Sequence, residues 1–243
     1  MINLKDRHVV IIGGGMGIGL AAANLLQAQG ARVFVGDRDP ASRERLPQGA
    51  GFHDTDATQP ASVEGLFASA ERAMGRIDGV FTTIGGAALG PFEDLDLAAW
   101  KREIDFNLNS AFVVGKAALP FLKRGGGGAL VFTSSGYALL AGVDRAAYSA
   151  SKAGLLAFSR SLAAIAAPQR TRVNCIAPGP TDTPRFRAMN GGDEGVERVR
   201  AQMPLGTIPT PEDSANVAIF LLSDAAAAIT GQTIHVNGGL VTP

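Results

Sequence analysis

The segment AAYSASKAG, residues 146–154, places a tyrosine and a lysine four positions apart among small residues. Residues with this spacing share one face of a helix, so Tyr148 and Lys152 can converge on one point. A free phenol titrates near about pH 10 and is a poor base at neutrality, but a nearby ammonium group stabilises the phenolate and lowers its pKa. A phenol tuned in this way can take a proton from an alcohol, or return one to a carbonyl.

Two serines lie upstream of this helix, in LVFTSSGYALL. The apolar run before Ser134 and Ser135 predicts a strand, and the carboxyl ends of strands border the ligand crevice of an open α/β sheet. A hydroxyl there can hold a reacting oxygen. Each of these residues alone is equally well explained by structure, whereas the combination favours catalysis. Tyr137 could line a substrate pocket, but no lysine follows it at the same spacing, so we do not propose it as the base.

A glycine-rich turn follows the first apolar run, in IIGGGMGIGLAAANLL. The predicted strand ends at Ile12 and the predicted helix begins near Gly17. Missing side chains at Gly13, Gly17 and Gly19 permit a tight turn, close approach to a pyrophosphate and packing of the helix on the strand. The helix N-terminus then offers free N–H groups to phosphates. Such turns also serve as plain connections, so the motif depends on its context.

The second apolar run, RVFVG, ends at Asp37. In a dinucleotide fold an acidic residue at this place meets the adenosine ribose hydroxyls. Its charge repels a ribose phosphate, which favours NAD over NADP. Arg38 weakens that preference because its guanidinium could hold the extra phosphate. An exposed turn without a ligand is the alternative interpretation.

Short β-branched runs alternate with alanine-rich segments of helical period, which predicts βαβ units and a parallel sheet covered on both faces. The runs are HVVII, RVFVG, GVFTT, ALVFTS, RVNCIA and TIHVN, and the segments include AAANLLQAQG, ASVEGLFASAERAMG and SKAGLLAFSRSLAAIAA. Gly30 and Gly75 are expected to cap helices, and Pro168 to end another. The four glycines at 125–128 are expected to form a flexible turn.

Composition narrows the function classes. With 243 residues, 46% of them hydrophobic, the chain can bury one core, so we expect a single domain over residues 1–243. The 22 basic and 22 acidic residues balance, which argues against nucleic-acid and membrane-surface partners. No signal region or membrane-spanning segment is evident, so we expect a soluble cytoplasmic protein. Cys175, the single cysteine, is expected to be a buried small hydrophobe, and no metal site is predicted.

Together these motifs resemble the short-chain dehydrogenase/reductase family, in its small single-domain branch, over essentially the whole chain. The matching segments are GGGMGIG, DATQPASV, FNLNSAF, SS followed by YSASK, APGPTDT and ITGQTIHVNGG. The resemblance implies a Rossmann-type, doubly wound, mostly parallel sheet of seven strands with helices on both faces. It also implies NAD(P)-dependent interconversion of a secondary alcohol and a ketone by hydride transfer.

The resemblance assigns roles to individual residues. It makes Tyr148 the general acid/base, Lys152 the group that lowers its pKa and binds the nicotinamide ribose, and Ser135 the group that orients the substrate oxygen. Asn107 matches the fourth catalytic residue of the family, which holds a water in a proton relay through Lys152; without the family match, a polar break in a helix is the better interpretation. The implied cofactor contacts are Gly13, Gly15, Met16, Gly17, Ile18, Gly19, Asp37, Arg38, Asp56, Ala57, Gly85, Tyr148, Lys152, Pro178, Gly179, Thr181 and Thr183.

Two places depart from the family pattern. Ile12 stands where the family usually has threonine, and residues 82–85, TTIG, stand where it usually has Asn-Asn-Ala-Gly. In the family these places lie close together, so the joint change predicts a repacked contact in which apolar or hydroxyl groups replace an amide network. We expect altered hydrogen bonds around the adenosine and the sheet centre, and unaltered chemistry at Tyr148.

The substrate is less well defined. Residues 184–205 fall where the family places its variable substrate lid, and their glycines and mixed charge suit a mobile loop. Arg185 and Arg187 could hold an anionic substrate or be solvated lid charges. An apolar pocket wall for a secondary alcohol, a cyclic ketone or an acyl chain could come from Ala87, Leu89, Leu139, Leu140 and Val143.

Two alternatives to an alcohol dehydrogenase stay open. A 3-oxoacyl thioester reductase ranks lower because the longer stretch found in acyl-carrier-protein ketoreductases is not obvious in GGAALGPFEDLD. A non-catalytic, redox-sensing dinucleotide binder has only the altered TTIG segment in its support. The resemblance also implies a homotetramer or homodimer built on helices at roughly 98–123 and 147–167, although a buried helix of a monomer would show the same small residues.

Overall fold

The computed structural model describes residues 2–242 and shows one sheet of seven parallel strands. Their order is β3-β2-β1-β4-β5-β6-β7, the doubly wound order in which a ligand crevice opens between β1 and β4. The strands are β1 (His8–Ile12), β2 (Arg32–Asp37), β3 (Gly51–Asp54), β4 (Gly79–Thr82), β5 (Gly128–Thr133), β6 (Thr171–Pro178) and β7 (Thr233–Val236). The predicted Rossmann-type fold is confirmed.

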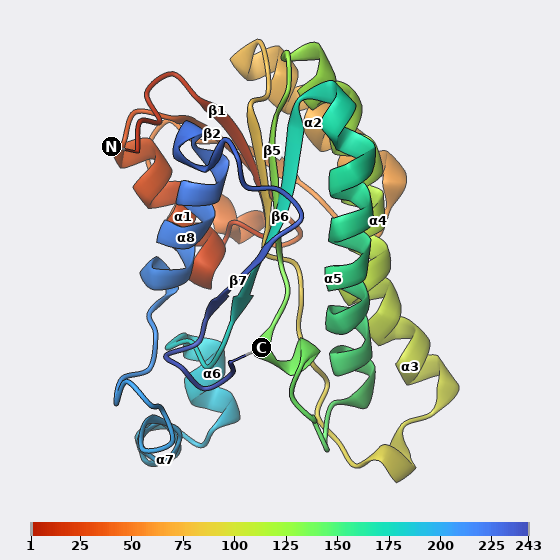
Figure 1. Cartoon of the computed structure of the whole chain (residues 1–243), viewed down its shortest axis with the longest axis vertical. Coiled ribbons are helices and arrows are strands. Elements are labelled where there is room, and N and C mark those ends of the chain that lie inside the picture. Colours follow the sequence, from red (N-terminus) through yellow and green to blue (C-terminus); the bar gives the residue numbers. More distant parts are fainter. Residues whose placement is uncertain (1, 243) are drawn as a thin grey trace.

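Helices cover both faces of the sheet (Figure 1). On one face α1 (Gly17–Ala28) and α8 (Pro211–Leu222) pack side by side, and their alanines and leucines share a core with the strands. On the other face lie α2 (Pro60–Met74), α4 (Ser110–Arg124) and α5 (Ala146–Ala166), which enclose a second core. The central strands are buried on both sides, which explains their continuous apolar runs.

No apolar run in the sequence predicts the edge strand β3. Its sequence is GFHD, and the side chains are half-buried or exposed because the strand lies at the border of the sheet. Phe34 to Asp37 of β2 pair with it in parallel register. Pairing with a strong neighbour therefore gives this segment its extended structure, rather than its own composition.

The helix expected over 98–123 contains a wide turn. It comprises α3 (Leu97–Ile104), a π-helical turn at Asp105–Asn109, and α4. Asn107 is buried at the centre of that turn. The Ser110 hydroxyl donates to the Phe106 carbonyl at 2.6 Å, a side-chain bond of the kind that accompanies such irregularities. Single π turns inside helices are frequent at functional sites, and this one turns Asn107 inward.

The segment expected as a mobile loop forms two short helices, α6 (Pro184–Met189) and α7 (Asp193–Arg200), at the carboxyl end of the sheet (Figure 1). The Thr183 hydroxyl caps α6 by accepting from the Phe186 N–H at 3.1 Å. Arg187 then braces both helices through Asp182 at 2.6 Å and Asp193 at 2.7 Å. These local bonds explain why the glycine-rich, charged segment is helical instead of irregular.

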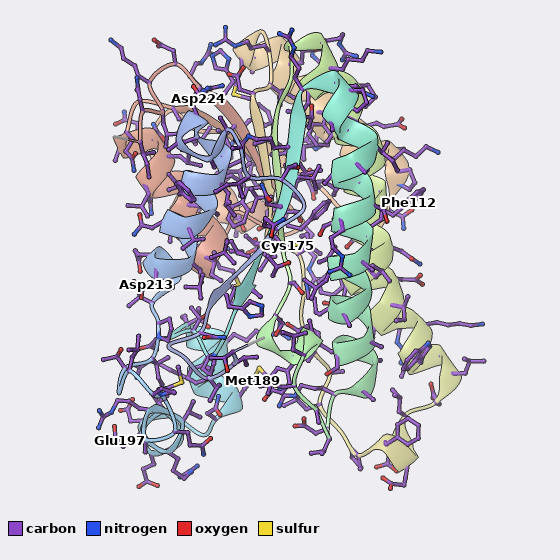
Figure 2. The ribbon with its side chains drawn as sticks, in the orientation of Figure 1. Phe112, Cys175, Met189, Glu197, Asp213 and Asp224 are labelled. Atoms are coloured by element: carbon purple, nitrogen blue, oxygen red, sulfur yellow. The ribbon has the colours of Figure 1, made fainter. Side chains whose placement is uncertain are left out.

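Cys175 belongs to β6, on the face of the sheet that α5 covers, in the middle of the molecule (Figure 2). It is buried as expected, and burial raises the pKa of its thiol to about 11. None of the helices in the described part of the chain is long and apolar enough to cross a membrane. Among residues 2–242, no three His, Cys, Asp or Glu side chains gather as a metal site.

Candidate active site

The glycine turn joins β1 to the N-terminus of α1. Gly13 and Gly17 have φ values of 82° and 52°, in the left-handed region that favours glycine. A Cβ at Gly19 would overlap the carbonyl oxygen of Gly13, so the helix could not pack this closely against the turn with any larger residue. Met16 is exposed and Ile18 is half-buried. The N–H groups in the first turn of α1, which begins at Gly17, have no partner within the helix. The turn therefore has the shape of a phosphate cradle.

Thr83 stands where the family usually has an asparagine, directly after β4 and beside the end of its parallel neighbour β1. The Thr83 hydroxyl donates to the Gly13 carbonyl at 2.8 Å and lies 3.3 Å from the Ile12 carbonyl. The backbone N–H of Thr83 also donates to the Ile12 carbonyl, at 2.9 Å. Ile12 is fully buried in the core behind this contact. One hydroxyl thus holds the glycine turn against β4 at the place where the sequence departs from the family pattern.

Asp37 ties the end of β2 to the glycine turn. One carboxylate oxygen accepts from the Gly15 N–H at 2.8 Å and the other from the Asp39 N–H at 3.0 Å. The Arg38 guanidinium lies 5.4 Å from the centre of the Phe106 ring. The predicted ribose-binding carboxylate therefore lies beside the predicted phosphate turn.

Arg45 is a residue of this region that sequence analysis missed. Its side chain donates to the Gly15 carbonyl at 2.9 Å, to Asp39 at 2.7 Å and to Ser42 at 2.9 Å. It comes from a short 3₁₀ helix, Pro40–Arg45, that carries no recognisable motif. Only the folded chain brings it to the turn, 30 residues away in sequence.

The loop after β3 holds Asp56 and Ala57. The Asp56 carboxylate accepts from the N–H and the hydroxyl of Thr58, at 2.9 and 2.7 Å, while Ala57 is buried. Next to this loop lies a depression of about 470 Å³. Its lining residues are Thr58, Gln59, Arg102, Asp105, Phe106 and Asn109. The loop after Asp56 and the π turn thus line one hollow, close to the residues expected to contact the adenine.

Lys152 is fully buried beneath the carboxyl end of the sheet. Its ammonium donates to the carbonyl oxygens of Thr133, at 2.9 Å, and Ile84, at 3.1 Å. Burial lowers the pKa of Lys152 to about 8, against a smaller opposite effect of Glu103. A Cβ at Gly85 would come within 2.6 Å of the ammonium nitrogen. Gly85 therefore allows the lysine to approach the loop after β4.

Asn107 holds the peptide groups of Gly86. Its Oδ1 accepts from the Gly86 N–H and its Nδ2 donates to the Gly86 carbonyl, both at 3.0 Å. The same Nδ2 lies 3.0 Å from the Glu103 carbonyl one helical turn away. A Cβ at Gly85 would lie 3.1 Å from Asn107 and 2.6 Å from Lys152, so both side chains flank this glycine. The structure thus brings two of the four predicted catalytic residues to one place.

Tyr148 and Ser135 complete the group. Tyr148 lies one turn from Lys152 on α5, and the ammonium is 5.8 Å from the centre of its ring. Burial raises the pKa of the Tyr148 phenol, while a hydrogen bond to Ser135 and the charges of Arg145 and Arg185 lower it. The spacing of Tyr148 and Lys152 predicts a lowered pKa for the phenol. In this structure burial outweighs the neighbouring groups, so the net direction is upward.

The loop after β6 approaches the glycine turn from the other side. β6 ends at Pro178. The Gly179 N–H donates to the Val236 carbonyl at 3.0 Å, and the Thr181 hydroxyl donates to the Gly179 carbonyl at 3.1 Å. A Cβ at Gly17 would lie 3.5 Å from the Thr183 methyl carbon. Segments more than 150 residues apart in sequence therefore meet at the start of α1.

Exposed apolar side chains occur in the loops that follow β4 and β5. Leu89, Leu139, Leu140 and Val143 are all exposed. Their role as a pocket wall stays a prediction. The Arg145 guanidinium stacks 4.2 Å from the centre of the Tyr137 ring and pairs with Asp144 at 2.7 Å.

Comparison with known proteins decides the family. A family model described as enoyl-(acyl carrier protein) reductase matches residues 13–241. A 2-(S)-hydroxypropyl-CoM dehydrogenase of Xanthobacter autotrophicus is 36% identical, and the match covers 98% of each chain. A short-chain type dehydrogenase/reductase from Mycobacterium ulcerans has a solved structure with TM-score 0.92 and 34% identity, covering 98% of this chain and 91% of that one. The chain belongs to the short-chain dehydrogenase/reductase family.

Other short-chain dehydrogenase/reductases match at nearly full length. The cis-4-hydroxycyclohexanecarboxylate dehydrogenase of Sinomonas cyclohexanicum is 35% identical over 96% of each chain. The 3-oxoacyl-[acyl-carrier-protein] reductase of Escherichia coli is 30% identical, over 98% of this chain and 99% of its own. This short-chain dehydrogenase/reductase is therefore an NAD(P)-dependent oxidoreductase acting on CH–OH groups, as the sequence motifs predict.

Proposed function

We propose that this enzyme interconverts a secondary alcohol and a ketone with NAD as its coenzyme, using Tyr148 as general acid/base. The observation that carries the proposal is the position of Lys152, buried and fixed by two carbonyl oxygens one turn from Tyr148 on α5. An ammonium held there can stabilise the phenolate that forms when Tyr148 gives up its proton.

The other two predicted catalytic residues have supporting positions. Ser135, buried just after β5 and close enough to lower the pKa of Tyr148, would orient the oxygen of the alcohol. Asn107 fixes the Gly86 peptide beside Lys152 and would hold the water that relays protons to the lysine. These roles follow the family pattern, and the burial and contacts of the side chains support them.

The residues of the crevice fit a dinucleotide. The glycine turn would hold the pyrophosphate, Asp37 the adenosine ribose, Asp56 and Ala57 the adenine, and the loop from Pro178 to Thr183 the nicotinamide. The left-handed turn glycines and the open N-terminus of α1 support this assignment. When bound, the nicotinamide supplies or accepts the hydride, and the protein contributes orientation and proton transfer.

We propose NAD rather than NADP because Asp37 would repel a ribose phosphate. The two nearby guanidiniums support this preference. Arg38 stacks toward Phe106, and Arg45 pairs with Asp39 and with the carbonyl of the turn. Both arginines have partners within the protein, which reduces their availability to a phosphate.

Residues 184–205 would act as the substrate lid, with α6 and α7 moving as a braced pair. Subunits would associate as a dimer or tetramer through α4 and α5, as the family resemblance implies. Phe112 lies on the outer side of α4 (Figure 2). It is 52% exposed, and Ile165 near the end of α5 is 62% exposed. Sedimentation velocity measures this association directly. The soluble cytoplasmic location stays a prediction.

Two other functions remain as candidates. Reduction of a 3-oxoacyl thioester is favoured by the 30% identity to the Escherichia coli acyl-carrier-protein reductase. We prefer alcohol oxidation because the relatives at 36% and 35% identity are named as dehydrogenases of hydroxylated substrates of other kinds. A non-catalytic dinucleotide binder draws support only from the altered TTIG segment, and Thr83 there keeps a firm contact with the glycine turn.

The test is reduction of NAD and of NADP by the purified protein with acyclic, cyclic and hydroxyacyl secondary alcohols. We expect turnover with at least one alcohol, and a higher kcat/KM with NAD than with NADP. Faster reaction with NADP would refute the coenzyme preference but keep the chemistry. Reduction of 3-oxoacyl thioesters without oxidation of simple alcohols would favour the second candidate.

A further inference from the structure

We propose that Arg185 binds an anionic group of the substrate, so that the alcohols oxidised by this enzyme carry a carboxylate or a similar compact anion. The proposal rests on the proposed function, because it places the reacting hydroxyl at Tyr148. It deepens that function by naming the substrate class.

The guanidinium of Arg185 lies against the inner loop of the site. Arg185 is the second residue of α6, and a Cβ at Gly86 would come within 2.6 Å of one of its terminal nitrogens and 3.0 Å of its central carbon. The other terminal nitrogen donates to the Ala87 carbonyl at 3.3 Å. Asn107 holds the Gly86 peptide through both its N–H and its carbonyl. The charge therefore lies on a fixed wall next to the catalytic group.

Arg185 also has a different charge environment from its neighbours. Arg187 pairs with Asp182 and Asp193, and Arg145 pairs with Asp144. Within residues 2–242, Arg185 has no carboxylate partner, and a backbone carbonyl is its one acceptor. Its remaining N–H groups are available to a ligand.

The charge of Arg185 reaches the catalytic residue, because it lowers the pKa of the Tyr148 phenol. An alcohol held at Tyr148 thus lies in the field of this guanidinium. The planar fork of a guanidinium matches a carboxylate in two parallel hydrogen bonds. Exposed Leu89 follows Ala87 in the inner loop, and exposed Leu139 follows Ser135 after β5, so both could contact an apolar carbon frame. A hydroxy acid with such a frame satisfies both features.

The test uses ligands matched in shape and different in charge. Binding of propanoate, cyclohexanecarboxylate and benzoate is measured by calorimetry, each against its neutral carboxamide, with and without NAD. The proteins are the wild type, Arg185→Gln, Arg185→Lys and Arg198→Gln. Arg198 is exposed on α7 and serves as the control for loss of a lid charge.

We expect the wild type and Arg198→Gln to bind at least one carboxylate about 10- to 100-fold more tightly than its carboxamide, the range for a charge-assisted bidentate contact. Arg185→Gln should lose this preference, and Arg185→Lys should keep part of it. The proposal is wrong if no carboxylate binds to the wild type, or if the preference survives in Arg185→Gln.

Two further results separate this proposal from related ones. If Arg185→Gln weakens NAD binding as much as carboxylate binding, the arginine binds the coenzyme and the proposal is wrong. If carboxylate binding depends on Arg185 but no secondary alcohol reduces NAD or NADP, the anion site stands and the proposed function fails. Turnover of neutral alcohols as fast as of their hydroxy-acid analogues would contradict the substrate class alone.

Discussion

Lys152 is fully buried although its side chain can carry a charge, and burial disfavours the charged form. An ammonium group in an apolar interior is stable only with hydrogen-bond partners, and the carbonyls of Thr133 and Ile84 supply them. Even so, burial lowers the Lys152 pKa to about 8, and it raises the pKa of the neighbouring Tyr148. The same apolar surroundings therefore shift the acid/base group and its partner in opposite directions, each toward its neutral form.

The ionisation of Lys152 should appear in the pH dependence of stability. Its pKa is about 8 when folded and 10.5 in the reference state, so the unfolded chain binds more protons between these values. The free energy of unfolding should therefore rise with pH across this window, relative to Lys152→Met, by on the order of 3 kcal/mol. Urea denaturation at several pH values measures it, with Lys123→Met as the exposed-lysine control. A constant difference between wild type and Lys152→Met would show that the lysine is not perturbed.

At the scale of elements, the structure depends on how β1, β4 and the glycine turn are joined. The Thr83 hydroxyl binds the Gly13 carbonyl, while Ile12 fills the core behind it. One short side chain thus connects the sheet centre to the turn that would hold the pyrophosphate. This connection lies where the sequence departs from the family pattern.

Replacing Thr83 by valine removes this hydroxyl with little change of shape. We expect a loss of about 1 kcal/mol in the free energy of unfolding and about fivefold weaker NAD binding, because the Gly13 carbonyl loses its partner. Thr83→Ser should retain both properties. Thr82→Val is the matched control, since the neighbouring hydroxyl has only a 3.5 Å contact with the Ile84 N–H. Equal effects of the two valine substitutions would show that the turn does not depend on Thr83.

At the scale of the whole molecule, the parallel sheet gathers the site. The carboxyl ends of β1, β2, β4, β5 and β6 all lie on one side, so segments from Gly13 to Thr183 meet there. This arrangement was predictable from the sequence because each central strand is a continuous apolar run followed by a functional motif. The position of Tyr148 relative to Lys152 was predictable as well, since helix spacing sets it.

Other features depend on contacts between distant segments, and the sequence pattern does not contain them. The edge strand β3 is extended because β2 pairs with it, and the π turn at Asn107 depends on contacts with Gly86. Arg45 reaches the glycine turn from a segment without a motif, and the sequence did not distinguish Arg185 from Arg187, which pairs with carboxylates instead. The upward shift of the Tyr148 pKa depends on the degree of burial, which spacing alone does not reveal.

The most direct test of the account compares wild type with Tyr148→Phe in the reduction of NAD by a secondary alcohol that the wild type oxidises, together with calorimetric NAD binding. We predict that turnover falls by about 10²- to 10⁴-fold, the contribution of a positioned acid/base group, while the Kd for NAD stays within about twofold. Turnover by Tyr148→Phe at the wild-type rate would contradict the account, because the proton would then have another acceptor.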